Sequence, residues 1–223
     1  MTDSPQPTSP ATSPALALPN EVWLAIFRRK ELSYFDLKRL SRVCKRFHGF
    51  EQSKSLDDLL FRSPPPPLGL HKDTPVVFHP ALDKANLVCT TPAEATVFLT
   101  RPNGTGKDGA DFEAVPIVDY PCADEYATSP AATKVSFYAG GKPIIQNKAG
   151  VMVRDVVHRA AKMWSSTPPP EVLLSVDLEG FVGEGETPNW RHTLGEHCFW
   201  EGMDKAKTIQ NNWVRLIPRW FGS

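Results

Sequence analysis

The apolar positions that follow Pro19 repeat with the spacing of a short amphipathic helix. Val22, Trp23, Ile26 and Phe27 stand at positions i, i+1, i+4 and i+5, so they share one helical face. Proline suits a first helical turn because the amide hydrogen that it lacks has no partner there. The pattern therefore predicts a helix that begins close to residue 19.

A second helix is predicted to begin at Ser33. Ser33 and Asp36 have the Ser-x-x-Asp spacing of a capping box, which satisfies backbone amides in a first helical turn. The apolar positions after this cap keep helical spacing, namely Leu37, Leu40, Cys44 and Phe47. Gly49 offers a C-terminal stop, so we expect one helix up to that glycine.

A third short helix is predicted around the leucines at positions 56, 59 and 60. It must end before the run Pro64 to Pro67, which favours a stiff extended spacer. Four segments follow from this pattern: a flexible Ser- and Pro-rich tail at 1–15, a helical module at 16–62, a proline-rich spacer at 63–74 and a C-terminal domain at 75–223.

The C-terminal segment has short β-type runs separated by turn residues. The predicted strands are 76–78, 96–100, 115–118, a hairpin of 134–138 with 142–146, and 213–217. One clear helix interrupts them, with Val153, Val156, Val157, Ala160 and Trp164 at helical spacing. The fold class expected is α+β, a three-helix N-terminal module followed by a small mixed α+β domain.

Composition narrows the class of protein without naming a function. The chain has 223 residues, 41% of them apolar, and its 25 Lys and Arg balance 25 Asp and Glu, so net charge suggests neither nucleic acid nor a membrane as partner. The four cysteines form no Cys-x-x-Cys pair, and there is no signal-peptide pattern and no run of 18 apolar residues. We expect a cytoplasmic or nuclear protein with reduced thiols.

The helical module resembles the F-box motif, on residues that occur in the motif's usual order. They are Leu18-Pro19, Glu21, Ile26-Phe27, Leu32, Asp36-Leu37, Leu40 and Val43-Cys44-Lys45. The resemblance implies an adaptor that binds the Skp subunit of an SCF ubiquitin ligase and presents a protein substrate for ubiquitination. It also implies the partner-binding residues: Leu18, Pro19, Val22, Ile26, Phe27, Leu37, Leu40, Val43 and Cys44, with Lys45 at the polar edge.

Two further interpretations concern the C-terminal domain and the apolar faces of the helical module. The stretches 78–82 and 151–157 are faintly similar to C-terminal regions of fungal F-box proteins, which implies no more than substrate recruitment. Alternatively, the apolar helix faces pack against the chain's own C-terminal domain, as amphipathic helices generally do.

A nucleic-acid-binding role is the main competing function. Residues 28–46 contain eight Lys or Arg and two acidic residues, a local net charge of +6. Lys38, Arg42 and Lys45 share a helical stripe that flanks the apolar one. A solvated helix face explains this stripe better than a nucleic-acid-binding surface.

The remaining chemical motifs do not predict an enzyme, a metal site or a cofactor. The stretch 103–107 departs from the phosphate-binding loop because Arg101 and Asp108 occupy required Gly and Ser/Thr positions. The potential metal ligands His192, His197 and Cys198, with Glu196 and Glu201, match no zinc spacing, and the acidic residues at 177, 179, 184 and 186 fit a solvated loop. A small enzyme in the C-terminal domain is the third alternative.

Overall fold

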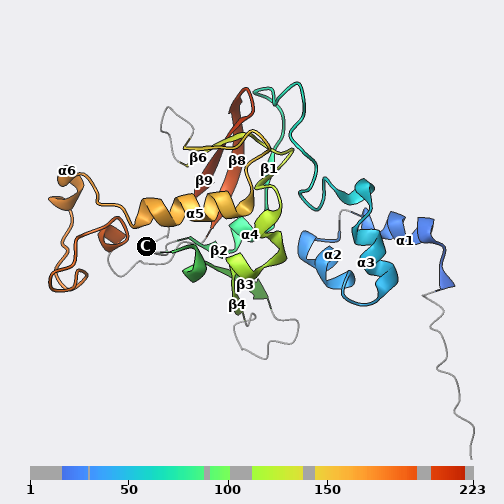
Figure 1. The fold of residues 1–223 in the computed structure, drawn as a ribbon, viewed down its shortest axis with the longest axis horizontal. Helices are drawn as coiled ribbons and strands as arrows, with labels where there is room; N and C mark the ends of the chain where they lie inside the picture. Colours follow the sequence, from blue (N-terminus) through green and yellow to red (C-terminus); the bar gives the residue numbers. More distant parts are fainter. Residues whose placement is uncertain are drawn as a thin grey trace, which may run out of the picture. The chain divides into compact units, whose positions relative to one another are not determined.

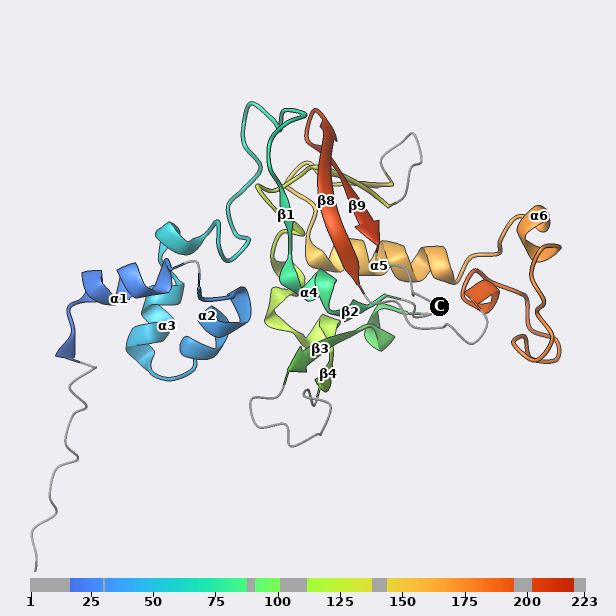
Figure 2. The same ribbon diagram turned by 180° about the vertical axis from the view of Figure 1, so that it is seen from behind.

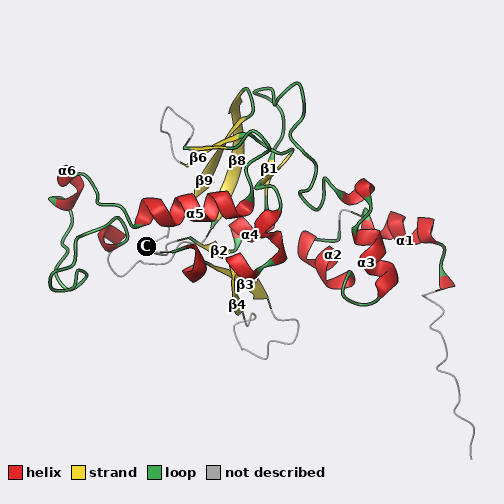
Figure 3. Cartoon of the chain, viewed as in Figure 1, coloured by secondary structure: helices red, strands yellow, loops and turns green. Residues whose placement is uncertain are grey.

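The computed structural model describes residues 17–29, 31–87, 91–100, 112–137, 144–194 and 202–218. The chain forms two compact units, Met1–Leu56 and Asp57–Ser223. In the described residues the first unit contains helices alone, whereas the strands belong to the second unit (Figures 1 and 3). The predicted α+β fold class is confirmed.

The described residues of the first unit form three short α-helices and a 3₁₀ turn. Their bounds are α1 (Asn20–Phe27), α2 (Tyr34–Leu40), α3 (Lys45–Glu51) and η2 (Lys54–Leu56). Helix α1 begins close to residue 19, as the sequence predicted, but Pro19 is its N-cap residue and lies just before the first helical turn. At α2 the Ser33 hydroxyl accepts the Asp36 amide while Asp36 accepts the Ser33 amide, so the predicted capping box is confirmed.

The prediction of a single helix from Ser33 to Gly49 was wrong. Helix α2 ends at Leu40, the amides of Arg42 and Val43 bond to carbonyls three residues back, and Cys44 is extended with φ −160° and ψ 164°. The Ser41 hydroxyl also donates to the Lys38 carbonyl at 2.8 Å, so a side chain occupies an acceptor at the end of the helix. Gly49 lies inside α3 and does not end it.

The described residues of the second unit form three small sheets. A two-stranded antiparallel sheet joins β1 (Val77–Phe78) to β5 (Thr128–Ser129), and a three-stranded antiparallel sheet has the order β2 (Ala85–Asn86), β3 (Thr96–Thr100) and β4 (Phe112–Pro116). The largest sheet has the order β7 (Ile145–Gln146), β6 (Lys134–Phe137), β9 (Trp213–Pro218) and β8 (Met203–Gln210). Strands β6 and β9 are parallel, and the other neighbours are antiparallel.

Most of the predicted strands occur close to their expected positions. Strand β3 has the predicted bounds. Strands β6 and β7 pair with each other, as the predicted hairpin required. The hairpin turn at 138–143 lies outside the described residues. The predicted strand 115–118 was wrong in its second half. Strand β4 ends at Pro116, which cannot donate a ladder hydrogen bond, and a 3₁₀ turn, η4 (Ile117–Asp119), follows.

Helix α5 (Val153–Trp164) supplies a large part of the second unit's core. It buries Val153, Val156, Val157, Ala160, Ala161 and Trp164. The helix runs between β6, β8 and β9 on one side and β3 and β4 on the other (Figures 1 and 2). Shorter helical pieces complete the unit: η3 (Pro92–Glu94), α4 (Pro80–Asp83), η5 (Pro121–Asp124), α6 (Pro170–Leu173) and η6 (His192–Leu194).

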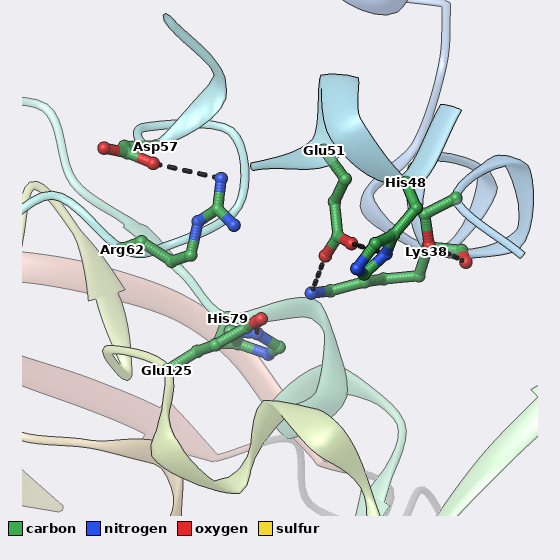
Figure 4. Close-up of polar contacts among 8 residues, drawn as sticks. Lys38, His48, Glu51, Asp57, Arg62, His79 and Glu125 are labelled. Atoms are coloured by element: carbon green, nitrogen blue, oxygen red, sulfur yellow. Dashed lines mark hydrogen bonds and ion pairs between the residues drawn. The ribbon is translucent and has the colours of Figure 1, made fainter. Parts of the chain in front are cut away.

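A buried polar pair lies near the start of the second unit. His79 and Glu125 are both buried, with His79 Nε2 3.0 Å from Glu125 Oε2 (Figure 4). His79 Nδ1 accepts the Ala81 amide and so caps α4, which requires the proton of a neutral ring to sit on Nε2 and point at the carboxylate. The Phe61 ring packs against His79, with centroids 4.7 Å apart.

These contacts also explain where the two units divide. Phe61 belongs to the second unit, because its carbonyl accepts the Tyr126 amide at 2.8 Å in addition to the ring contact with His79. Arg62 pairs with Asp57 inside the same unit at 3.0 Å (Figure 4). The division at residues 56 and 57 therefore comes before the predicted module end at residue 62.

Gly202 makes a close backbone approach in the second unit. It has φ +90°, and a Cβ atom placed there would lie 2.0 Å from the Asp83 carbonyl oxygen. Because Asp83 ends α4 and Gly202 immediately precedes β8, the chain passes directly over the end of that helix. Only glycine fits both the positive φ and the missing space.

Candidate partner-binding site

An aromatic cluster holds α1 against α3 in the helical unit. The Phe47 ring lies 4.6 Å from Trp23 and 5.5 Å from Phe27, and Phe50 lies 5.8 Å from Phe27, between ring centroids. Most of these pairs are tilted or edge-to-face, the geometry that aromatic quadrupoles favour. Phe27 is completely buried, so it forms the interior of the unit.

Arg46 fixes the beginning of α1 against α3. Its Nε and Nη2 atoms donate to Asn20 Oδ1 at 3.0 and 2.7 Å, and Nη2 donates also to the Leu18 carbonyl. The guanidinium lies 5.6 Å from the Phe50 ring centroid. One side chain from α3 thus sets the position of the segment in which Leu18 and Pro19 lie.

An ion pair joins α2 to α3. Lys38 Nζ lies 2.6 Å from Glu51 Oε1, and both side chains are largely enclosed (Figure 4). His48 Nδ1 approaches the other carboxylate oxygen at 3.6 Å, and Lys38 Nζ lies 5.6 Å from the Tyr34 ring centroid. Removing one partner of a charged pair that is this enclosed would leave the other charge buried and uncompensated.

The cap of α2 carries a perturbed carboxyl group. The Ser33 hydroxyl donates to Asp36 at 2.6 Å and is the main reason why the pKa of Asp36 lies below its ordinary value. Partial burial of the carboxyl raises this pKa, whereas the Ser33 amide and nearby Arg39 lower it further. The carboxylate therefore stabilises the start of α2 at neutral pH.

The ten predicted partner-binding residues differ sharply in exposure. Leu18, Val22 and Val43 are exposed by 37%, 41% and 65%, although they are apolar. Pro19 and Lys45 are also exposed, while Ile26, Leu40 and Cys44 are half-buried. Phe27 and Leu37 are buried, so these two have almost no surface to offer to a partner.

The structure does not support the basic stripe that suggested nucleic-acid binding. Lys38 lies on α2, Lys45 begins α3, and Arg42 lies in the turn between them, so the three share no helix face. Lys38 is paired with Glu51, and Arg46 is bonded to Asn20. The predicted stripe of Lys38, Arg42 and Lys45 on one helix was wrong because the helix ends at Leu40.

The other chemical candidates gain little from the structure. His192 Nε2 lies 3.5 Å from Glu186 Oε1, whereas Glu196, His197, Cys198 and Glu201 lie outside the described residues, as does the glycine-rich stretch 103–107. Asp177 accepts the Glu179 amide at 3.0 Å in an exposed turn. Among the described residues there is no group of three or more His, Cys, Asp or Glu placed to hold a metal ion.

Sequence reasoning missed the side-chain contacts that hold the helices of the first unit together. The bond from Arg46 to Asn20 spans 26 residues, and the Lys38–Glu51 pair joins helices that the sequence had predicted as one. A positive charge at each of these positions is just as typical of a solvated helix face. Spacing alone therefore could not distinguish a solvated side chain from one that bonds to another helix.

Comparison with known proteins identifies the helical region. Residues 15–60, about a fifth of the chain, match the family model described as F-box-like. Neither the curated proteins nor the solved structures gave a match to this chain. In the part of the chain that the structure describes, no helix is both long enough and apolar enough to cross a membrane.

Proposed function

Because the chain carries an F-box-like domain, which supports a role as an SCF-type ubiquitin ligase adaptor, we propose that it binds the Skp subunit and presents a protein substrate through its second unit. The observation that carries this proposal is that the matched residues cover a helical unit with apolar side chains left exposed. F-box domains generally bind Skp, and F-box proteins are generally adaptors, not enzymes.

In this proposal the exposed apolar residues form the centre of the contact with Skp. Leu18, Pro19, Val22 and Val43 lose their water on binding, with the half-buried Ile26, Leu40 and Cys44 beside them. Lys45 lies at the polar rim. The buried Phe27 and Leu37 act indirectly, because they hold the helices that present these side chains.

The second unit is the part of the chain that we propose recruits the substrate. It has its own buried core around α5 and its own sheets, which are the features of a separate domain. We propose further that the protein is of the fungal F-box type and acts in the cytoplasm or the nucleus.

The test is coexpression and pull-down of the full chain with a Skp adaptor. Val43→Glu is the sharpest variant, because a side chain that is 65% exposed can be replaced without disturbing the core. Leu18→Ala combined with Pro19→Ala trims the neighbouring apolar surface. Leu174→Glu is the matched control, since Leu174 is 89% exposed and lies in the second unit.

We expect the wild-type chain and Leu174→Glu to hold the adaptor equally well. Burying a charge at the centre of an apolar interface should weaken the complex by at least roughly tenfold, so Val43→Glu should lose it. If wild type does not bind, or if Val43→Glu and the Leu18/Pro19 double variant both bind like wild type, the proposal fails.

A further inference from the structure

An open groove of about 510 Å³ lies on the second unit, and no residue of the F-box-like domain lines it. Its walls come from the end of the β6–β7 hairpin and from one face of α5: Ile144, Ile145, Gln146, Asn147, Lys148, Asp155, His158 and Arg159. Asp155, His158 and Arg159 stand at i, i+3 and i+4, so they project from the same side of α5. The volume lies in the range of ligand-binding pockets.

The walls of this groove are held in place by hydrogen bonds. Asn147 donates to Asp155 Oδ2 at 3.2 Å, and its own Oδ1 accepts the Ala149 amide at 3.0 Å. Its backbone amide bonds to the Thr133 carbonyl next to β6. The loop after β7 is therefore tied both to the sheet and to α5, and the groove is preformed.

The charge of the groove is positive. Lys148 and Arg159 contribute cations and His158 a titratable ring, against one carboxylate, that of Asp155. This carboxylate is already engaged, because it accepts the Met152 amide at 3.0 Å as well as the Asn147 side chain. It caps the start of α5 and does not pair with Arg159.

Arg159 lines the groove, and no hydrogen bond or ion pair with another described residue occupies its guanidinium. A guanidinium matches the planar geometry of carboxylate and phosphate oxygens. Ile144 and Ile145 place apolar surface beside it, which fits a ligand with an apolar part next to its charge.

We propose that this groove binds an oxyanion, a phosphate or carboxylate group, on a peptide segment of the substrate protein. Arg159 bonds the oxyanion through its guanidinium, and Lys148 adds a second positive charge at the rim. The assignment to a substrate rests on the proposed adaptor function, whereas affinity for an oxyanion does not.

Fluorescence anisotropy with the full chain and labelled peptides tests this inference. Three peptides of the form Gly-Leu-X-Leu-Gly, each with an amidated C-terminus, carry phosphoserine, glutamate or serine at X, so that the two oxyanions are compared with a neutral side chain. We expect at least one of the two anionic peptides to bind roughly 10- to 100-fold tighter than the serine peptide, and inorganic phosphate to compete. Equal binding of all three peptides would overturn the inference.

Variants assign the effect to named residues. Arg159→Gln should abolish the preference for the anionic peptides, and Arg159→Lys should keep only part of it, because lysine retains the charge without the planar fork. Arg154→Gln is the matched control: it removes the same charge from the same helix, but Arg154 pairs with Asp124 outside the groove. Its peptide binding should equal that of wild type.

Lys148→Gln keeps the test decisive if the Arg159 variants fold poorly, because Lys148 is exposed. A several-fold loss of anionic-peptide binding is expected for it, and an unchanged preference in Lys148→Gln and in every folded Arg159 variant would contradict the inference. Failed adaptor pull-down with an intact peptide preference would refute the adaptor function alone. Intact pull-down without any preference would refute the groove alone.

Discussion

Replacing the buried Gly202 with alanine should destabilise the second unit. The reason is the passage of the chain over the end of α4, where a Cβ would lie 2.0 Å from the Asp83 carbonyl oxygen and 2.7 Å from that of Leu82. Both atoms belong to backbone, so neither can swing away. Gly202 also has φ +90°, which L-residues adopt only with strain.

The magnitude follows from two separate costs. Placing an alanine in the left-handed region costs about 1–2 kcal/mol. Relieving the clash requires the backbone to move by roughly 1 Å, and overpacking of this kind costs about 1–3 kcal/mol more. The total of about 2–5 kcal/mol is a large part of the stability of an ordinary domain.

Urea unfolding followed by tryptophan fluorescence measures this effect in the right unit, because five of the six tryptophans lie between residues 164 and 220. Gly180→Ala is the matched control. Gly180 has φ +81° but nothing within 4 Å of an added Cβ, so it carries the conformational cost without the clash and should lose only about 1–2 kcal/mol. If Gly202→Ala lost no more than Gly180→Ala, the close approach would not be the cause.

Three further predictions concern single side chains. Glu51→Gln should lower the free energy of unfolding by about 1–3 kcal/mol. In a double-mutant cycle, the same substitution in a Lys38→Met background should lower the free energy of unfolding by clearly less. The pKa of Asp36 is lowered in the folded state, so its carboxylate stabilises above its ordinary pKa of 3.8, and the advantage of wild type over Asp36→Asn in urea unfolding should be lost progressively as the pH falls below 3.8. His79→Ala should destabilise the second unit by about 2–4 kcal/mol through the lost cap and the lost donor to Glu125, and His79→Asn should recover about 1 kcal/mol as a cap; equal thermal stability of the two variants would contradict this.

Helix α5 could be predicted from the sequence almost to the residue, because its buried face is made of closely spaced valines and alanines and ends before a run of prolines. The turn between α2 and α3 could not. Leu37 and Phe47 both point into the interior, so their spacing remained compatible with a continuous helix across a segment where the chain in fact turns. Apolar periodicity indicates which side chains are buried. It can continue unchanged across a break between two helices, because both helices bury their apolar residues in the same core.

The partner-binding face shows the same limit in another form. The resemblance supplied ten residues, but exposure divides them, with Val43 open to solvent and Phe27 enclosed by Phe47 and Phe50. Both are apolar residues of helical segments, and only tertiary packing distinguishes them. The groove at Arg159 was not predicted, since it depends on a loop after β7 meeting α5 eight residues further along.

The place of β9 in the largest sheet has a consequence for how the protein emerges from the ribosome. The strand lies between β6 and β8, and the Trp213 indole donates to the Ser136 hydroxyl across 77 residues. The aromatic cluster of the helical unit needs only residues 23–50, so it can close while the rest is still being translated. The sheet cannot close until residue 218 has left the exit tunnel, and until then the edge of β6 that pairs with β9 is vacant.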